Sequence, residues 1–393
     1  MADDHYTING TDILQNNILA ALTNTTVAPN ESGDQVTTLL QFANIYRPIH
    51  GIAAPIICVL GIIANCLNIV VLTRKNMVSP TNILLTWLAI SDGLTMLAYF
   101  PYAILNYHIY THSSTVPLAN ARFIMFYAIF SVIVHSISIW LTVSLAVFRY
   151  VFISYPRRGA KLCSIYRAKL TVFIVCVVVT LVCIPNSIMY KFDSYPSGPD
   201  ANETSWYITI KMDTEGFRFL KNFNLWIQAI LVKLLPCLLL AILSLLLIKQ
   251  MNDAEKRRKK LMNNKNKSDD DSRRHRKTNR TTRMLVVVVV LFVITETPQG
   301  ILQLLAGIIS SFFDRVYNPL GDLMDTIALF NNGINFVLYC TMSKQFRDTF
   351  IKIFIQDFVS GSKRTPNTTA QTTDAHAMTA LRNGATRTAV SEV

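Results

Sequence analysis

Seven apolar runs, each with almost no charged residues, dominate the sequence and decide what it can fold into. In one of them, the 30 residues 284–313, Glu296 is the single Asp, Glu, Lys or Arg. About 20 apolar residues are enough for a helix to cross the hydrocarbon core of a bilayer. The sequence therefore predicts an all-α membrane protein, a seven-helix bundle with spans near 48–73, 80–107, 120–150, 169–190, 222–249, 283–311 and 319–341.

The charge distribution supports this prediction and orients the bundle. Only 16% of the residues are charged, against roughly a quarter in soluble domains. The net charge of +13 comes from the links between the runs, so it indicates no basic face for nucleic acid. Basic residues fill alternate links, which are expected to be cytoplasmic. The N-terminus is then extracellular at the plasma membrane and the C-terminus cytoplasmic, with glycosylation acceptors outside at Asn9, Asn24, Asn30 and Asn202.

The chain divides into four segments on the same pattern. Residues 1–45 and 357–393 are rich in Thr, Asn and Ser and are predicted to be disordered tails, the first extracellular and the second cytoplasmic. Residues 46–356 form the seven-helix domain, and residues 251–282 within it form a basic third cytoplasmic loop. Apolar residues spaced along 342–354 predict an amphipathic eighth helix on the inner leaflet. None of the seven cysteines lies in a predicted outer segment, so no disulfide is predicted.

Polar residues inside the runs recur at helical spacing. A polar group in the hydrocarbon region is costly and should face the bundle interior. Such stripes lie on the third, sixth and seventh spans: Ser131, His135, Ser138, Thr142 and Arg149; Glu296, Gln299 and Gln303; Asp325, Asn331, Asn332 and Asn335. One interpretation is hydrogen bonding between helices, worth about 0.6 kcal/mol for each pair. The other is a water-lined binding cavity, which the charged residues Asp92, Lys233 and Glu296 favour.

Four motifs carry a family resemblance. "ANCLNIVVL", "LLTWLAISD", "LAVFRYVFISYP" and "NNGINFVLYC" resemble, in order and spacing, the landmark motifs of rhodopsin-like G-protein-coupled receptors over residues 45–356. "FPYAILNY", "TTRMLVVVVVLFVITETPQGIL" and "SKQFRDTF" look most like the invertebrate myosuppressin, sex-peptide and FMRFamide-like neuropeptide receptors. The resemblance implies a receptor, and no enzyme, for an extracellular amidated peptide ending in Arg-Phe-amide. It also implies coupling to a heterotrimeric G protein of the inhibitory class.

The resemblance also implies roles for single residues. Asn65, Pro236 and Pro298 match structural positions, the two prolines being helix kinks. Residues that match the family's internal sodium site are Asp92, Ser138, Asn331 and Asn335; no other cofactor is implied. Residues that match positions coupled to the G protein are Arg149, Tyr150 and Tyr339.

Several positions depart from the family pattern. Phe148 replaces the acidic residue before Arg149, and Thr278 stands where the sixth span might offer a second acid, so the usual ion pair of Arg149 is not expected. Phe336 replaces the proline of the seventh span. Ile124 stands where the third span usually has a bridging cysteine, and the link 191–221 has no cysteine to pair with it. That link must be held by other contacts.

Glu296 occupies the position where most relatives carry a tryptophan below the ligand. We expect it to pair with Lys233 beside His135 when the site is empty and to bind the arginine of the ligand when it is occupied. The alternative is a protonated Glu296 that is hydrogen-bonded to a neighbour. The other expected ligand-binding residues are Ser131, Gln299, Gln303, Asp325, Trp226, Tyr102 and Tyr107.

Other readings and partners remain open. An ion or proton transporter that uses Asp92, Lys233 and Glu296 is the main alternative, although the sequence has no two-half repeat. The ending "VSEV" resembles a ligand for a PDZ protein, which would take the carboxylate of Val393. The threonine-rich tail could bind arrestin after phosphorylation.

Overall fold

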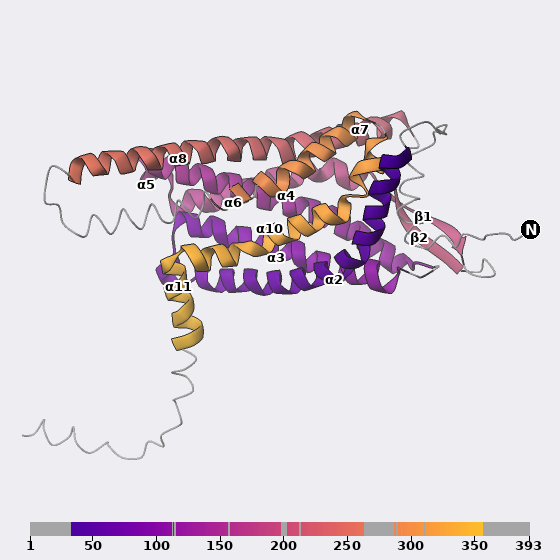
Figure 1. Cartoon of the computed structure of the whole chain (residues 1–393), viewed down its shortest axis with the longest axis horizontal. Helices are drawn as coiled ribbons and strands as arrows, with labels where there is room; N and C mark the ends of the chain where they lie inside the picture. Colours follow the sequence, from indigo (N-terminus) through magenta and orange to yellow (C-terminus); the bar gives the residue numbers. More distant parts are fainter. Residues whose placement is uncertain are drawn as a thin grey trace, which may run out of the picture. The chain divides into compact units, whose positions relative to one another are not determined.

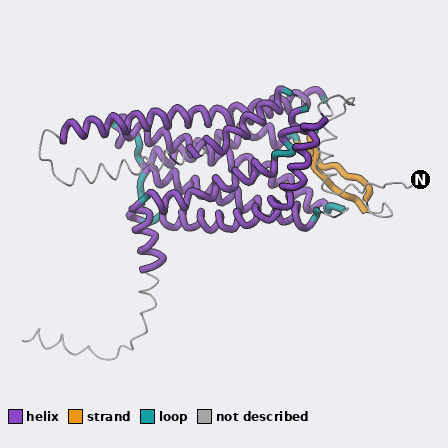
Figure 2. Tube along the Cα trace, viewed as in Figure 1, coloured by secondary structure: helices purple, strands orange, loops and turns teal. Residues whose placement is uncertain are grey.

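The computed structural model describes residues 33–111, 113, 115–155, 158–197, 203–211, 214–262, 287, 290–291, 293–309 and 311–356. These residues form a bundle of long helices with a two-stranded hairpin (Figures 1 and 2), so the predicted helical bundle is confirmed and the hairpin is an addition to it. The bundle belongs to the unit that ends at Arg347, and a second unit starts at Asp348. In chain order the elements are α2 (Gly33–Leu72), η1 (Lys75–Met77), α3 (Pro80–Ile104), η2 (Leu105–Ile109), α4 (Leu118–Ser154), α5 (Gly159–Leu162), α6 (Ile165–Ile188), β1 (Tyr190–Ser197), β2 (Glu203–Ile210), α7 (Glu215–Ile227), η3 (Gln228–Leu234), α8 (Leu235–Met262), helix 293–308, η4 (Phe313–Tyr317), α10 (Gly321–Met342), α11 (Lys344–Ile351) and η5 (Lys352–Gln356).

Five helical stretches among the described residues are long and apolar enough to cross a membrane. They are Thr38–Leu72, Pro80–Ile109, Leu118–Ser154, Ile165–Ile188 and Glu215–Gln250. Helix 293–308 is the longest continuous stretch of the sixth span among the described residues. The seventh, α10, is less apolar because it carries two aspartates and three asparagines. Large apolar side chains such as Ile52, Leu60 and Leu181 are exposed on the helices, as expected for faces that contact lipid.

Two predicted boundaries are wrong. The first helix begins at Gly33, so residues 33–45 are helical instead of part of a disordered tail. The stretch contains good helix formers and no proline before Pro48, so nothing stops the helix from continuing outward. The fifth span likewise continues as α8 to Met262, so residues 251–262 are helix and not loop. Its Glu, Lys, Arg, Leu and Met residues all favour a helix.

Side-chain caps set the starts of three helices. Ser79 accepts a hydrogen bond from the Asn82 amide at 3.1 Å, and Pro80 takes the first turn of α3, where no N–H is needed. Ser164 caps α6 and Thr214 caps α7 in the same way. The short link before each span therefore fixes where the helix begins.

Two buried clusters lie in the core of the part of the bundle that the structure describes. One joins α2, α3 and α10 through residues that include Cys58, Met96 and Leu329, and the other joins α4, η3 and α8. Gly61 of α2 and Gly333 of α10 lie so close that a Cβ added to Gly333 would be 3.6 Å from the Gly61 Cα. Small residues allow the two helices to approach this closely. In lipid the hydrophobic effect does not drive helices together, so they associate through such close packing.

The hairpin β1–β2 shows how the link 191–221 is held. Its strands are antiparallel, in a register from Tyr190 opposite Ile210 to Ser197 opposite Glu203. Val116, just before α4, pairs with β2: its carbonyl accepts from the Trp206 amide at 2.9 Å, and its amide donates to the Ser205 hydroxyl at 3.1 Å. All seven cysteines are free thiols, so backbone pairing attaches the hairpin to the start of α4.

Candidate ligand-binding site

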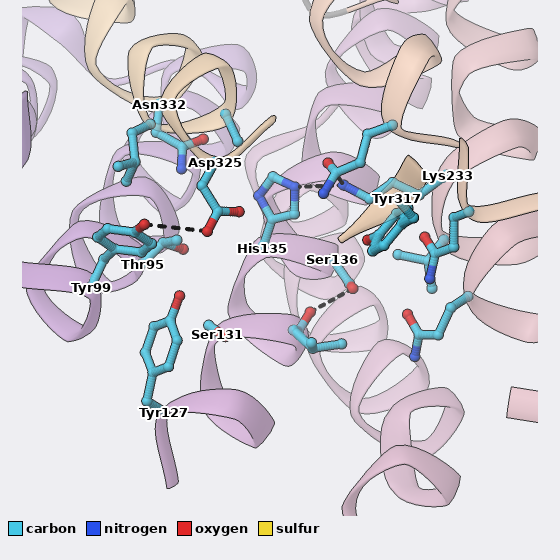
Figure 3. A pocket seen from close by; sticks show the side chains of 17 residues that line it. Thr95, Tyr99, Tyr127, Ser131, His135, Ser136, Lys233, Tyr317, Asp325 and Asn332 are labelled. Carbon is cyan, nitrogen blue, oxygen red and sulfur yellow. Dashed lines mark hydrogen bonds between the residues drawn. The ribbon is translucent and has the colours of Figure 1, made fainter. Parts of the chain in front are cut away.

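The polar stripes meet in a cavity of about 180 Å³ inside the bundle (Figure 3). Six of the ten expected ligand-binding residues line it or contribute to its wall: Ser131, His135, Lys233, Gln299, Gln303 and Asp325. Figure 3 shows Tyr99 and Asp325 on one side of His135, and Lys233 on the other. The structure therefore shows the predicted convergence of polar side chains on one cavity.

A local irregularity of the backbone positions Lys233. Residues Gln228–Leu234 form a π-helical turn, in which the Leu235 amide bonds back to the Ile230 carbonyl. Pro236 follows directly and cannot donate to an α-helical ladder. π-Turns of this kind are frequent at functional sites. The turn brings Gln228 and Lys233, five residues apart, onto the same wall of the cavity.

The ammonium group of Lys233 has all three of its hydrogens engaged. Its Nζ lies 2.6 Å from Glu296 Oε2, 2.9 Å from Gln299 Oε1 and 2.9 Å from His135 Nε2. An ammonium has three donors and no acceptor, so His135 must accept at Nε2 and carry its hydrogen on Nδ1. The 3.4 Å contact between His135 Nε2 and Glu296 Oε2 then has no hydrogen to share. Lys233 and Glu296 therefore form the predicted ion pair, which has no net charge.

Glu296 lies behind Lys233 and is not part of the cavity wall. Its side chain is 1% exposed, and it is not among the residues that line the cavity. Its second oxygen, Oε1, is buried without a hydrogen-bond partner among the described residues. The carboxylate that does face the cavity is Asp325, whose Oδ2 accepts a 3.2 Å hydrogen bond from the Tyr99 hydroxyl. Of these two acidic residues, only Asp325 is therefore on the cavity wall.

Three expected mouth residues lie away from the cavity wall. Tyr102 stacks on Tyr127, with ring centroids 4.2 Å apart, and so supports a tyrosine that does line the cavity. Tyr107 donates to Asp322 Oδ1 at 2.6 Å. Trp226 is 40% exposed and does not line the cavity, because it lies on α7 before the π-turn. These three residues contribute no surface to the cavity in this state.

Several residues of the wall were not predicted. On the second span Asp92, Thr95 and Tyr99 recur at steps of three and four, so the stripe rule that worked on the third span would have found Tyr99. Gln228 and Lys233 are five residues apart, and only the π-turn aligns them. Tyr317 lies on η4, outside any apolar run. Burial raises the pKa of the Tyr317 phenol to about 12, so the group stays protonated and can donate.

Below the cavity, Asp92 is the centre of a second polar cluster. The Ser138 hydroxyl donates to its Oδ1 at 2.6 Å, and the Asn335 amide donates to its Oδ2 at 2.9 Å. Asn65 donates to the carbonyls of Gly61 and Asn332 and so links α2 to α10. A carboxylate with hydroxyl and amide oxygens nearby fits a hard cation in part. No hydrogen bond from Asn331 to Asp92 occurs among the described residues, and the sodium site stays a prediction.

The residues assigned to G-protein coupling lie at the far ends of α4 and α10. Arg149 Nε is buried without a hydrogen-bond partner among the described residues, and Thr278 lies outside them. Tyr150 follows it near the end of α4 and is partly exposed. Tyr339 is buried against Phe346, with ring centroids 5.6 Å apart, which anchors the turn into α11.

Some predictions fall outside the described residues. They are the glycosylation acceptors Asn9, Asn24, Asn30 and Asn202, the threonine-rich tail and Val393. Pro298 lies within helix 293–308, two residues after Glu296, as predicted for the sixth span.

Gly300 provides a test of how closely the sixth span must approach Lys233. A Cβ at this position would lie 3.1 Å from Lys233 Cβ and 3.2 Å from Leu234 Cδ2. At Gly307 the nearest atom would be 4.0 Å away. We expect Gly307→Ala, the control, to raise the free energy of unfolding by up to about 1 kcal/mol through helix propensity. The free energy of unfolding of Gly300→Ala should be about 1–3 kcal/mol lower than that of the control, because its Cβ is overpacked. Equal thermal stability of the two purified variants would contradict the close approach.

The family is shown by comparison with known proteins. The sequence profile of the family described as "Serpentine type 7TM GPCR chemoreceptor Srw" matches residues 52–357. The G-protein coupled receptor dmsr-1 of Caenorhabditis elegans is 29% identical over 86% of this chain and 74% of its own length. The Drosophila melanogaster sex peptide receptor is 31% identical over 78% and 73%. The FMRFamide receptor of the same fly is 25% identical over 82% and 57%.

These relatives are receptors and not enzymes, and the transporter alternative does not account for the similarity. The landmark motifs, the interior cavity and the five membrane-length apolar helices among the described residues agree with the family match. The chain is therefore a multi-pass membrane protein that belongs to the family of serpentine seven-transmembrane G-protein-coupled receptors.

Proposed function

We propose that this receptor binds a short extracellular peptide that carries an arginine and ends in a carboxamide, and that it signals through an inhibitory heterotrimeric G protein. The observation that carries the proposal is the charge of the cavity. Lys233 is neutralised by Glu296 and has no free hydrogen, so Asp325 is the charge that the wall presents. Among the described residues of the wall, Asp325 is the one carboxylate, and no lysine or arginine forms an ion pair with it, which favours a cation.

The geometry also favours an amide end over a free acid. A terminal carboxylate would find no available ammonium hydrogen on Lys233 and would lie near Asp325. A carboxamide instead has neutral partners on the wall. Gln228 Nε2 and Asn332 Nδ2 are buried there without hydrogen-bond partners among the described residues, and both are donors suited to a carbonyl.

The cavity is small, which limits what enters it. Its volume is about 180 Å³. It can hold one or two side chains at the end of a peptide, and the rest must lie outside. Two relatives, the FMRFamide receptor and the sex peptide receptor, have peptide ligands in their names.

Signalling requires that the peptide bind one of two arrangements of the bundle more tightly than the other. Lys233 links η3 to helix 293–308 through Glu296 and Gln299. A ligand that draws Gln299 or Lys233 toward Asp325 would loosen this link and release the sixth span, with Pro236 and Pro298 as its weak points. Arg149, Tyr150 and Tyr339 would then meet the G protein. An arrestin and a PDZ protein at Val393 stay predicted partners.

A nucleotide-exchange assay on membranes that contain the receptor tests the proposal. The probes are N-acetyl-Phe-Met-Arg-Phe-amide, its free-acid form and a form with citrulline in place of arginine. We expect the amide to stimulate exchange and each altered peptide to be at least about tenfold less potent, a loss of about 1.4 kcal/mol or more. Pertussis toxin should abolish the signal.

The control is Arg149→Ala, which should bind the labelled amide but stimulate no exchange. If no Arg-Phe-amide peptide binds or stimulates above untransfected membranes, the proposed ligand class is wrong. If exchange survives pertussis toxin, the receptor is not coupled to the inhibitory class.

A further inference from the structure

Asp325 is the end of a hydrogen-bond chain that starts on the first helix. His50 of α2 is fully buried and lies outside the cavity wall. Its Nε2 is 2.7 Å from the Tyr99 hydroxyl, and that hydroxyl is 3.2 Å from Asp325 Oδ2. Its Nδ1 is 2.7 Å from the Thr326 hydroxyl. The chain therefore runs from Thr326 through His50 and Tyr99 to the cavity carboxylate.

The hydrogens at Thr326 determine which ring nitrogen of His50 is protonated. The Thr326 hydroxyl donates its one hydrogen to the Asp322 carbonyl at 2.9 Å. It accepts from the Tyr46 hydroxyl at 2.9 Å, so its remaining lone pair must accept from His50. Nδ1 of His50 therefore carries a hydrogen. If the ring is neutral, Nε2 is an acceptor.

Tyr99 cannot satisfy both of its neighbours with its single hydrogen. If it donates to a neutral His50, its oxygen faces Asp325 with no hydrogen between them. If it donates to Asp325, the same gap opens at His50. One additional proton closes the chain, either on His50 Nε2 with Asp325 ionised or on Asp325 with His50 neutral. The geometry thus provides for one shared proton.

We propose that His50 is a positioning residue for Asp325, and that a ligand cation bound at Asp325 displaces the proton that the two residues share through Tyr99. The proposal rests on the proposed function for its ligand, an arginine side chain, but the shared proton belongs to the empty receptor. A proton and a guanidinium compete for the same carboxylate. Because arginine stays charged at all relevant pH values, the pH dependence must come from the receptor.

Other charged groups act on this chain from each element packed against His50. On its own helix Arg47 lies over the Tyr107 ring, 5.3 Å from its centroid, and opposes the additional proton. Asp322 of α10, which accepts from the Tyr107 hydroxyl, favours it. The Tyr107 ring of η2 packs against His50 with centroids 5.0 Å apart. The full burial of His50 also disfavours a charged ring, so the shared proton is not held tightly.

The sign of the pH effect follows from competition. At low pH the chain holds its proton, and the ligand must displace it. At high pH the proton is gone, and the cation binds Asp325 without that cost. Affinity should therefore rise with pH, by up to about tenfold per unit where one proton is released for each ligand bound.

The first arm of the test uses purified receptor without ligand. The infrared difference spectrum between acidic and alkaline samples should contain a carboxyl or imidazole contribution. We expect it to change in both His50→Gln and Asp325→Asn, because the proton belongs to both groups. His108→Gln is the matched control: this histidine bonds the Gly51 carbonyl and lies outside the chain. A spectrum that His50→Gln leaves unchanged would overturn the shared proton.

The second arm measures competition binding of N-acetyl-Phe-Met-Arg-Phe-amide and its citrulline form across the same pH range. The arginine peptide should gain affinity with pH on the native receptor and on His108→Gln. The slope should vanish for the citrulline peptide, and on His50→Gln and Tyr99→Phe. A slope that survives in any of these three overturns the inference. Absence of arginine-peptide binding at every pH would instead refute the proposed function and leave the first arm standing.

Discussion

Lys233→Met is expected to lower the free energy of unfolding of the receptor by about 3–5 kcal/mol, because it leaves the Glu296 carboxylate buried without its cation. Glu296 is 1% exposed, and its Oε1 already has no partner among the described residues. The ammonium also donates hydrogen bonds to Gln299 and His135, so its removal leaves two more polar groups without this hydrogen-bond partner. Thermal unfolding of the purified receptor, together with the amount at the cell surface, measures the loss.

Two further variants make this result specific to the pair. Lys169→Met removes an exposed lysine on α6 and should change stability by no more than about 0.5 kcal/mol. The double change Lys233→Met with Glu296→Gln removes both charges and should recover much of the stability, since a neutral pair of similar volume is tolerated better than one stranded ion. If the double variant is less stable than Lys233→Met, the stability lost in Lys233→Met does not come from the ion pair with Glu296.

Asp325→Asn is expected to weaken binding of an Arg-Phe-amide peptide by about 2–5 kcal/mol, which is about 30-fold or more. Asparagine has nearly the same shape and can still accept from Tyr99, so the change removes the charge and little else. The control is Asp322→Asn, a neighbouring carboxylate that binds Tyr107 and does not line the cavity. We expect Asp322→Asn to weaken binding of the peptide by less than about threefold.

A double-mutant cycle identifies the partner of the arginine. The citrulline peptide should bind the native receptor and Asp325→Asn about equally weakly, because the pair is already broken in both. On the Glu296→Gln receptor, the citrulline peptide should still bind more weakly than the arginine peptide. If citrulline is instead tolerated on Glu296→Gln and still costly on Asp325→Asn, the arginine reaches Glu296, as the sequence-based hypothesis expected.

Much of the bundle was predictable because the bilayer imposes a simple rule. A helix must be apolar for about 20 residues, and its few polar side chains must face inward. Spacing along the third and sixth spans therefore placed His135 and Glu296 correctly inside the bundle. The pairing of Glu296 with Lys233 followed from the family resemblance, which placed the two residues near each other, and from charge, since a buried ion needs a partner.

The boundaries and the wall of the cavity were less accessible from sequence. Helix ends outside the bilayer depend on small propensity differences, so α2 and α8 run further than predicted. The hairpin is attached to Val116 by one backbone hydrogen bond and one to the Ser205 hydroxyl, and neither has a sequence signature. Gln228 joined the wall only because the backbone before Pro236 widens into a π-turn.

The sequence by itself determined that the chain crosses the membrane seven times and that its buried charges must find partners, because transfer of polar groups into hydrocarbon depends on composition and helical period. Only the tertiary structure decided which carboxylate faces the cavity. Glu296 and Asp325 are equivalent in a hydropathy pattern, yet Lys233 covers one and Tyr99 presents the other to the cavity. That difference depends on how helices rotate and pack against each other, which is a property of contacts between residues far apart in the chain.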